Sequence, residues 1–322
     1  MFEPVRALWG VLLLLLAAGP PMCLAQEQAG PHPANAAQAI GPQAASIGPP
    51  IMLEKSPSSE AASSEAASSE IKRPIRAERN LVFRRVGESN VTADLFRPDD
   101  DLVYPLVMVI HGGAWSAGDK WQVGDHAREL AQAGFVALAI NYRLAPAHLI
   151  PDQIEDCRVA LQWGVEQAQS WRADASRVCL WGYSAGGHLS AVLATDPQAG
   201  DPPICAVVAG GAPCDFEFIP SESTALAHVF GGTRAELPEL YLQASPTQLA
   251  NSHSPPFFFF HGEQDALVPA ASSQRMHHRL RALGVESNYR LVPERGHLLT
   301  FIDFNSRRLA IEFLRAHTTD TP

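Results

Sequence analysis

A serine between two glycines stands where an apolar run gives way to a helical pattern. Residues 182–186 read Gly-Tyr-Ser-Ala-Gly, and they come shortly after the start of an apolar run at Val178. A Gly-x-Ser-x-Gly sequence between a strand and a helix is typical of a nucleophile elbow, a sharp corner that exposes the serine hydroxyl. Glycines two residues before and after the serine leave room for the turns that pack against that corner. We therefore predict that Ser184 is a nucleophile and that the N–H groups of the helix starting there favour a developing oxyanion.

Serine chemistry also needs a base that takes the hydroxyl proton and an acid that orients the base. Asp265 follows the apolar run 257–260, and His297 follows the run 288–292. Both residues therefore stand shortly after a predicted strand ends, which is where parallel sheets place their sites. The chain order Ser184, Asp265, His297 is the order of the triad in α/β-hydrolases.

A glycine-bearing turn follows another predicted strand. Residues 111–115 read His-Gly-Gly-Ala-Trp and come directly after the apolar run 106–110. Backbone N–H groups of this turn could complete an oxyanion hole together with that of Ala185. Attack by a serine on a carbonyl carbon creates the negative charge that such donors stabilise, so the constellation predicts acyl transfer.

Other histidines have simpler explanations. His188 lies four residues after Ser184, but it falls in the helix that is expected to pack beneath the elbow. His111 and His261 each precede a glycine at the end of a predicted strand, which favours hydrogen-bonded structural roles. Metal-binding spacings of the CxxC or HExxH kind do not occur, so the sequence predicts no metal site.

Apolar runs alternate with helical patterns along most of the chain. Predicted strands cover 81–83, 91–96, 106–110, 135–140, 178–180, 205–209, 257–260 and 288–292. Predicted helices cover about 123–133, 152–169, the segment after residue 184, 270–283 and 306–317. Continuous apolar strands that alternate with helices predict an α/β fold with a mostly parallel sheet covered on both faces. The alternating pattern of 91–96 instead favours an antiparallel strand at the edge of the sheet.

The N-terminal region differs in composition from the rest of the 322-residue chain. Residues 1–25 combine a basic residue, a short apolar core and small residues before position 26, which predicts a cleaved secretory signal peptide. Residues 26–70 are rich in Ala, Ser, Pro and Glu, and we interpret them as a disordered low-complexity tether. Residues 71–322 are long enough for one α/β catalytic domain. The expected location is secreted or periplasmic, with an uncleaved membrane anchor as the alternative.

Charge and cysteine usage limit the partners of the protein. The formal net charge is −10, and −6 remains on residues 71–322 because residues 26–70 carry five Glu and one Lys and residues 1–25 are neutral. A mildly acidic domain argues against nucleic acid or an anionic membrane as a partner, and no stable membrane insertion is expected after signal cleavage. Cys179 is expected to be a buried thiol, whereas a disulfide between Cys205 and Cys214 stays open.

Further short segments complete the pattern in a fixed order. They are His-Gly-Gly-Ala-Trp at 111–115, Gly-Asp-Lys at 118–120, Asn-Tyr-Arg-Leu-Ala-Pro at 141–146, the elbow at 182–188, Ala-Ser-Pro at 244–246, 255–265, Val-Pro at 268–269 and Gly-His at 296–297. From about residue 80 to its C-terminus the chain therefore resembles the α/β-hydrolase carboxylesterases. That group includes hormone-sensitive-lipase-like and feruloyl-esterase-like enzymes and kynurenine formamidases. So many ordered matches are specific for the fold and the triad, and much less so for the substrate.

The resemblance implies a role for each candidate residue. Ser184 is implied as the nucleophile, His297 as the general base and Asp265 as the acid that orients it. The family spacing favours Asp265 over the nearby Glu263. Backbone N–H groups implied as oxyanion donors are those of Gly112, Gly113, Ala114 and Ala185. An alanine at 114 replaces the third glycine of many lipase-like members, which is compatible with donation from the backbone.

These observations predict a serine hydrolase that cleaves small or short-chain esters through an acyl-enzyme and needs no cofactor. The predicted cap, at about 214–251, is short, which favours an open site. An arylformamidase-type amidase is the enzymatic alternative, suggested by the His-Gly-Gly-x-Trp turn, although a secretory signal fits it poorly. A catalytically silent binding module on the same fold is a third possibility, and the intact triad argues against it. The physiological ester and the oligomeric state stay open.

Overall fold

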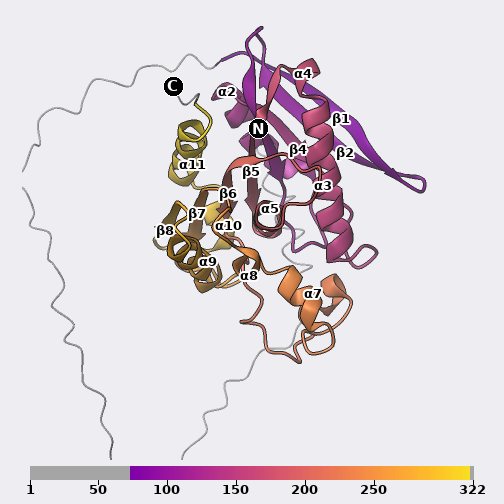
Figure 1. Ribbon diagram of the computed structural model, residues 1–322, viewed down its shortest axis with the longest axis vertical. Coiled ribbons are helices and arrows are strands. Elements are labelled where there is room, and N and C mark those ends of the chain that lie inside the picture. The colour runs from indigo at the N-terminus through magenta and orange to yellow at the C-terminus, as the bar shows by residue number, and fades with distance from the viewer. Residues whose placement is uncertain (1–72, 320–322) are drawn as a thin grey trace, which may run out of the picture. The chain divides into compact units, whose positions relative to one another are not determined.

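The computed structural model describes residues 73–319, which form an α/β domain around one sheet of eight strands (Figure 1). The strands are β1 (Ile75–Val86), β2 (Ser89–Pro98), β3 (Tyr104–Ile110), β4 (Val136–Ile140), β5 (Ala173–Tyr183), β6 (Ile204–Gly210), β7 (Phe257–Gly262) and β8 (Ser287–Val292). Their order across the sheet is β1-β2-β4-β3-β5-β6-β7-β8, and all pairs from β4 to β8 are parallel. The predicted signal peptide (1–25) and tether (26–70) lie outside the described residues.

Helices cover both faces of the sheet (Figure 1). The longer ones are α2 (Gly124–Gln132), α3 (Ile150–Glu166), α5 (Ala185–Thr195), α9 (Ala270–Ala282) and α11 (Phe304–Ala316). The shorter ones are η1 (Lys120–Val123), α4 (Ala168–Trp171), α6 (Ala227–Phe230), α7 (Pro238–Gln243), α8 (Pro246–Leu249) and α10 (His297–Phe301). This arrangement confirms the predicted α/β fold with a mostly parallel sheet. Within residues 73–319, no helix is both long and apolar enough to span a bilayer.

The first two strands form a long antiparallel hairpin. β1 lies at the edge of the sheet, whereas β2 pairs antiparallel with both β1 and β4. The antiparallel pairing of 91–96 is therefore confirmed, but its predicted position at the edge is wrong. The polar residue Asp94 contributed to the alternating pattern, yet it is 5% exposed and accepts hydrogen bonds from Arg79 at 2.6 Å and from the Asn80 N–H at 2.9 Å. A buried carboxylate paired with a partly exposed arginine thus produced a pattern that resembles a solvent-exposed face.

Alternate residues of the central strands belong to two apolar layers. Leu106, Met108 and Ile110 of β3 belong to the layer that includes residues of α3, α5 and α9. Val107 and Val109 belong to the layer on the opposite face, with residues of α2 and α11. Because both faces are covered, the strand is apolar at each of these positions, as the continuous runs in the sequence predicted.

The carboxyl ends of the parallel strands carry the candidate residues. The glycine-bearing turn follows β3, Ser184 follows β5 and Asp265 follows β7, so all three emerge at one edge of the sheet. His297 follows β8 at the same edge. The sequence predicted a loop at His297, but this residue is the first of the short helix α10. Five residues are too few for a helix to be stable alone, so α10 depends on its tertiary contacts.

The segment between β6 and β7 forms the predicted cap, with α6, α7 and α8 as short helices (Figure 1, orange). Cys205 lies near the start of β6 and Cys214 lies beyond its end, and both thiols are free. Cys205 Sγ lies 3.7 Å from Ser176 O, whereas Cys214 Sγ lies 3.6 Å from Ala212 O, so each thiol has its own partner and no disulfide joins them. Cys179 is a buried free thiol in β5, as predicted.

Candidate active site

Ser184 occupies the sharp corner between β5 and α5. Its backbone angles are φ 54° and ψ −123°, a conformation that a non-glycine residue adopts only when its surroundings enforce it. A Cβ on Gly182 would lie 2.1 Å from Gly186 O, and a Cβ on Gly186 would lie 2.1 Å from Ile110 O. The close packing of the backbone therefore requires both glycines, as the Gly-x-Ser-x-Gly pattern predicted.

The backbone N–H groups of Ser184 and Ala185 differ in their hydrogen bonding. The Ser184 N–H donates to Gly210 O of β6 at 2.8 Å, which ties the corner to the neighbouring strand. Ala185 is the first residue of α5, so its N–H has no acceptor in the helix, and it donates to no other residue of 73–319. This N–H stands at the positive end of an 11-residue helix, directly beside the serine. It is therefore available to an anion that forms there.

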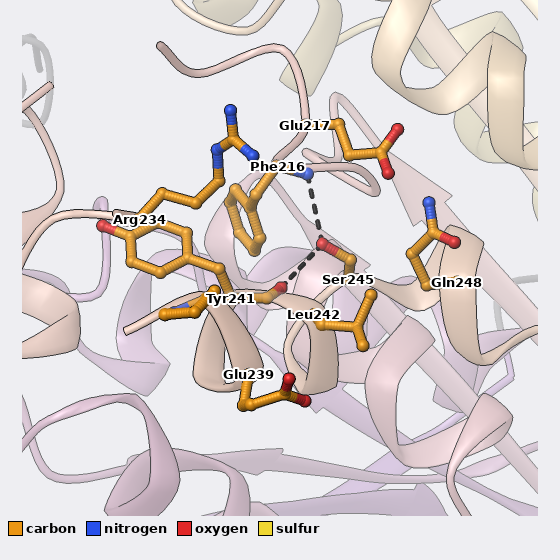
Figure 2. A pocket seen from close by; sticks show the side chains of 9 residues that line it. Phe216, Glu217, Arg234, Glu239, Tyr241, Leu242, Ser245 and Gln248 are labelled. Carbon is orange, nitrogen blue, oxygen red and sulfur yellow. Dashed lines mark hydrogen bonds between the residues drawn. The ribbon is translucent and has the colours of Figure 1, made fainter. Parts of the chain in front are cut away.

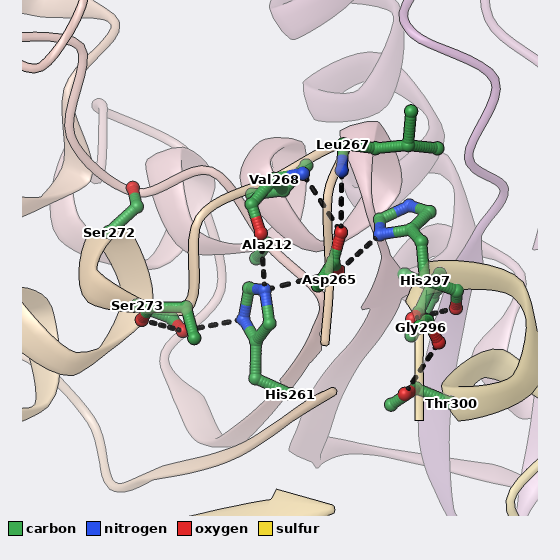
Figure 3. A network of polar contacts seen from close by, with 12 residues as sticks. Ala212, His261, Asp265, Leu267, Val268, Ser272, Ser273, Gly296, His297 and Thr300 are labelled. Atoms are coloured by element: carbon green, nitrogen blue, oxygen red, sulfur yellow. Dashed lines mark hydrogen bonds and ion pairs between the residues drawn. The ribbon is translucent and has the colours of Figure 1, made fainter. Parts of the chain in front are cut away.

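Asp265 and His297 form a buried hydrogen-bonded pair (Figure 3). His297 Nδ1 lies 2.6 Å from Asp265 Oδ2. The Asp265 side chain is fully buried and the His297 side chain is 9% exposed. A carboxylate acceptor at Nδ1 keeps the proton on that nitrogen, which leaves Nε2 with a free lone pair as a general base requires.

The turn after β7 holds the other oxygen of the Asp265 carboxylate. Oδ1 accepts from the Leu267 N–H at 3.0 Å and from the Val268 N–H at 2.9 Å. Burial raises the pKa of Asp265, but hydrogen bonds from His261 and His297 lower it, and the pKa lies well below its usual range. Asp265 is therefore ionised at neutral pH in spite of its burial.

His261 is a second imidazole on the Asp265 carboxylate (Figure 3). Its Nε2 lies 3.2 Å from Asp265 Oδ2 and 2.9 Å from Val268 O, and both of these oxygens are acceptors. Nε2 therefore carries a hydrogen, while Nδ1 lies 2.7 Å from Ser273 Oγ. These contacts confirm that His261 is a hydrogen-bonded structural histidine, and they show that it holds the turn that carries Asp265.

The last residue of β6 and the residue after it bring His297 close to the serine corner. Gly210 O accepts the hydrogen bond from Ser184, and a Cβ on the next residue, Gly211, would lie 3.2 Å from His297 Cε1. Ser184 and His297 thus both contact this dipeptide. Their side chains share no hydrogen bond in the described structure. Such bonds between nucleophile and base are often long or misaligned until a substrate is bound.

The turn after β3 lies against the serine and is strained. A Cβ on Gly112 would lie 3.2 Å from Ser184 Cβ. The backbone angle φ is positive at three consecutive residues, 123° at Gly113, 50° at Ala114 and 58° at Trp115. Two of these residues are not glycine, and each such conformation costs of order 1–3 kcal/mol. Trp115 itself is 5% exposed, so its ring packs beneath the surface and does not form an open wall.

Hydrogen bonds to carbonyl oxygens orient the peptide units of this turn. His111 Nδ1 donates to Gly112 O at 2.7 Å, and the Ser116 N–H donates to Gly113 O at 3.1 Å. Because the C=O and N–H of a trans peptide unit point in opposite directions, the N–H groups of Gly113 and Ala114 face away from these donors. Neither N–H donates a hydrogen bond elsewhere in 73–319. Burial lowers the pKa of His111 to about 4, so its ring is a neutral structural donor at pH 7, as predicted.

The two residues that competed for catalytic roles make other contacts. His188 is fully buried beneath the elbow, where its Nδ1 accepts from Trp115 Nε1 at 3.2 Å and its Nε2 donates to Ala244 O at 2.7 Å. Burial lowers the pKa of His188 to about 4, so it is neutral at pH 7, which confirms the structural role predicted for it. Glu263 is exposed and accepts from the Glu294 N–H at 3.1 Å, instead of contacting an imidazole.

A cavity of about 220 Å³ opens within the cap segment (Figure 2). Its lining residues are Phe216, Glu217, Arg234, Pro238, Glu239, Tyr241, Leu242, Ser245 and Gln248. The Phe216 ring lies 6.0 Å from the Trp115 ring, so the cavity is connected by aromatic packing to the strained turn after β3. Ser184, Asp265 and His297 do not line it. Within residues 73–319, no group of three or more His, Cys, Asp or Glu side chains could hold a metal ion.

Sequence reasoning missed two side chains that contact the candidate triad. Tyr183, the residue before the serine, donates from its hydroxyl to His297 O at 2.5 Å. His261 was expected to be structural, but its contact with Asp265 was not foreseen. The one signal in the sequence was that a buried Tyr or His needs a partner for its polar atoms, and that signal does not name the partner.

A family model described as BD-FAE matches residues 93–280, more than half of the chain. The chain belongs to the BD-FAE family. The match includes the strained turn, Ser184 and Asp265, and it ends before His297. This membership confirms the resemblance to α/β-hydrolase carboxylesterases that the sequence motifs indicated.

Two relatives from Mycobacterium tuberculosis have esterase names. Esterase LipC is 31% identical over 217 residues, which cover 62% of this chain and 54% of LipC. The probable carboxylic ester hydrolase LipM is 30% identical over 220 residues, which cover 63% of this chain and 51% of LipM. The chain thus spans about half the length of these relatives.

Solved structures share the fold at lower sequence identity. A truncated carbohydrate esterase from gut microbiota has a TM-score of 0.70 at 23% identity, over 76% of this chain and 97% of that chain. Esterase 2 of Thermogutta terrifontis, in a structure phosphoramylated by tabun, has a TM-score of 0.64 at 21% identity, over 74% of this chain and 94% of that chain. These similarities establish the α/β-hydrolase fold of the domain.

Proposed function

We propose that this protein is a serine hydrolase that cleaves small or short-chain carboxylic esters through an acyl-enzyme. The observation that carries the proposal is the buried pair of Asp265 and His297, joined at 2.6 Å close to the strained corner at Ser184. A nucleophile on a sharp corner, an oriented imidazole and an ionised acid are the groups that acyl transfer by serine requires. The esterase names of LipC and LipM support the same class of reaction.

In the first half of the reaction, the Ser184 hydroxyl oxygen attacks the carbonyl carbon while His297 Nε2 takes the hydroxyl proton. The carbonyl electron pair moves to oxygen, and Asp265 stabilises the imidazolium through its Nδ1–H. The tetrahedral intermediate collapses when the bond to the alcohol oxygen breaks, and His297 gives its proton to that oxygen. The alcohol leaves and the acyl group stays on Ser184.

In the second half, a water molecule attacks the acyl carbon and loses a proton to His297 Nε2. Collapse of the new intermediate breaks the bond to the serine oxygen, which regains its proton from His297. The carboxylic acid then leaves and the free enzyme is restored. Every proton transfer uses the same imidazole, so its position relative to Ser184 governs both halves.

The N–H groups of Gly113, Ala114 and Ala185 are the proposed oxyanion donors. Their support is that none of them donates elsewhere in 73–319 and that their peptide units are held beside the serine. Removing one such donor costs about 2.7–4 kcal/mol of transition-state stabilisation in a related type of site. Gly112 contributes a close approach to Ser184, since a side chain there would also lie 2.9 Å from Tyr183 O.

The proposed preference for small acyl groups rests on the cap. The cap consists of three short helices of four, six and four residues, which leave little chain to enclose a long acyl group. We expect faster hydrolysis of 4-nitrophenyl butyrate than of 4-nitrophenyl palmitate. A preference for palmitate at equal dispersed concentration would overturn the proposed size class.

We also propose that residues 1–25 direct export, that residues 26–70 tether the domain, and that residues 71–322 form the catalytic unit. The support is the composition of the N-terminal region. The enzyme then works outside the cytoplasm, in the periplasm or secreted. Sequencing the N-terminus of the exported protein tests this assignment, because a start at Met1 contradicts signal cleavage.

A fluorophosphonate probe tests the proposed reaction directly. The probe phosphonylates an activated serine, so mass spectrometry of the protein should find one adduct on Ser184. The matched control is Ser184→Ala, which should remain unlabelled and lose hydrolysis of 4-nitrophenyl acetate. If neither protein is labelled or active, the proposed function is wrong and a binding module on this fold is favoured. Faster hydrolysis of N-formylkynurenine than of the acetate ester would instead favour an arylformamidase.

A further inference from the structure

The side chain of Tyr183 links the two segments that carry the proposed nucleophile and base. Tyr183 directly precedes Ser184, and its hydroxyl donates to the main-chain oxygen of His297 at 2.5 Å. The two residues are 114 positions apart in the chain, so this is a contact between separate elements. The ring centroids of Tyr183 and His297 lie 5.1 Å apart. Tyr183 is 4% exposed, so the tyrosine side of the contact is buried.

Two glycines provide the space for this contact. A Cβ on Gly210 would lie 2.6 Å from Tyr183 Cδ2, and a Cβ on Gly211 would lie 2.8 Å from the Tyr183 hydroxyl oxygen. Gly211 also has φ 52°, a conformation that favours glycine. Any larger residue at either position would displace the tyrosine ring. Glycines at 210 and 211 therefore leave the room that the Tyr183 side chain needs to reach His297.

Two aromatic rings pack against the ring of Tyr183. The Phe260 ring of β7 lies 5.7 Å away and the Phe301 ring lies 5.1 Å away. Phe301 is the last residue of α10, the helix that begins with His297. Tyr183 therefore contacts α10 through its hydroxyl at one end of the helix and through its ring at the other.

The hydroxyl of Tyr183 stays protonated under all conditions in which the enzyme would work. Burial raises the pKa of Tyr183 well above its usual range, and the negative charge of Asp265 raises it further. A protonated hydroxyl with a carbonyl oxygen at 2.5 Å is a hydrogen-bond donor. The contact therefore does not titrate near neutral pH.

Asp265 and Tyr183 restrain different parts of His297. Asp265 binds the imidazole Nδ1 and so sets the rotation of the ring, but it belongs to the turn after β7. Tyr183 binds the main chain of His297 and is covalently joined to Ser184. Only the second contact relates the position of the base directly to that of the nucleophile. Because α10 has five residues, it lacks the internal stability to set that position alone.

We propose that Tyr183 is a positioning residue, which holds His297 at the distance from Ser184 that proton transfer requires. The inference rests on the proposed function, because a base needs to be positioned only where a serine reacts. A displacement of about 1 Å between reacting groups can lower the rate about 100-fold. Loss of the hydroxyl should therefore lower kcat at least tenfold and leave KM within about twofold, since the substrate is not contacted.

The test compares Tyr183→Phe with Tyr104→Phe. Phenylalanine keeps the ring that packs against Phe260 and removes the hydroxyl alone. Tyr104 is a matched control, because its hydroxyl also makes a hydrogen bond, to Asp100 at 2.9 Å, but at the start of β3, the opposite end from the site. Both variants and the wild type are titrated with the fluorophosphonate probe, so that kcat refers to reactive sites only, and their melting temperatures are measured.

The expected result is a kcat at least tenfold lower for Tyr183→Phe, a phosphonylation rate lowered in parallel, and a melting temperature close to that of Tyr104→Phe. A merely structural hydroxyl would lower the melting temperature and leave kcat per titrated site unchanged, and this outcome overturns the proposal. If the wild type itself is neither labelled nor active, the proposed function fails and the positioning role falls with it. Wild-type activity with equal kcat in both variants rejects the positioning role alone.

Discussion

Replacing Asp265 with asparagine tests the logic of the site, because the surroundings decide how the new amide is oriented. Two N–H groups, those of Leu267 and Val268, point at the Oδ1 position at 3.0 and 2.9 Å. Only the amide oxygen can accept from them, so the NH2 group takes the Oδ2 position, 2.6 Å from His297 Nδ1. His261 Nε2–H, which lies 3.2 Å from that position, keeps Val268 O as its acceptor at 2.9 Å. His297 Nδ1 then becomes an acceptor, and the imidazole proton moves to Nε2. In that tautomer Nε2 cannot take a proton from Ser184.

The size of the fall in kcat distinguishes the loss of one hydrogen bond from a wrong tautomer of His297. Loss of a hydrogen bond to a charged group costs about 1.5–3 kcal/mol, which corresponds to a rate lowered roughly 10- to 150-fold. A wrong tautomer removes the base altogether, and the equivalent substitution in a serine protease lowers kcat by about 10⁴. We expect Asp265→Asn to lower kcat by about 10³–10⁴, because the two N–H groups enforce the wrong tautomer. KM should change little, since Asp265 is buried behind His297.

Initial rates of 4-nitrophenyl acetate hydrolysis at pH 7 provide the assay, with circular dichroism as the check on folding. Glu263→Gln is the matched control, because Glu263 is an exposed carboxylate two residues away that accepts from the Glu294 N–H at 3.1 Å. It should keep kcat within about twofold of the wild type, as surface changes usually do. A loss of less than tenfold in Asp265→Asn, or a larger loss in Glu263→Gln, would refute the assignment of the acid.

Two further predictions concern stability. Gly186→Ala places a Cβ 2.1 Å from Ile110 O and should lower the unfolding free energy by about 3 kcal/mol or more. The control Gly124→Ala should be nearly neutral, because the nearest atom to its new Cβ is Phe96 Cζ at 3.9 Å. Equal melting temperatures of the two variants would contradict the packing argument. Because the pKa of Asp265 is lower in the folded than in the unfolded state, its charge stabilises the fold above the unfolded value of about 4 and loses this effect as the pH falls toward the folded value. The difference in unfolding free energy between wild type and Asp265→Asn should therefore narrow below about pH 4, and a constant difference from pH 7 to pH 3 would show that the charge is not the cause.

Local patterns in the sequence predicted the central part of the fold well. The apolar runs 106–110, 205–209 and 257–260 all lie within strands, because a strand buried on both faces must be apolar at every position. The elbow was equally clear, since glycine at 182 is required by the nearby Gly186 O, although glycine at 186 is required by Ile110 O of β3, which is distant in the sequence. Where the constraint is local, residue types and spacing are sufficient.

Predictions that depended on distant pairing were less successful. The polar residue Asp94 made the segment 91–96 look like an edge strand, because its ion pair with Arg79 of β1 forms only in the folded hairpin. The pattern therefore did not show that β1 would pair with the outer side of this strand. The nearness of Cys205 and Cys214 in sequence said nothing of their distance in space, since a strand extends between them. Likewise α10 is not encoded by its five residues alone, and its contacts with the rest of the domain make it helical.

The sequence likewise predicted some features of the candidate site but not others. The sequence by itself determined the types and order of Ser184, Asp265 and His297, because each follows a parallel strand and such strands end at one edge of the sheet. Only the tertiary structure decided which carboxylate meets the imidazole, which histidine supports that carboxylate, and that Tyr183 reaches the base. Hydrogen bonds have a range of about 3 Å, whereas these partners lie up to 114 residues apart, so only the folded arrangement of the sheet can bring them within reach.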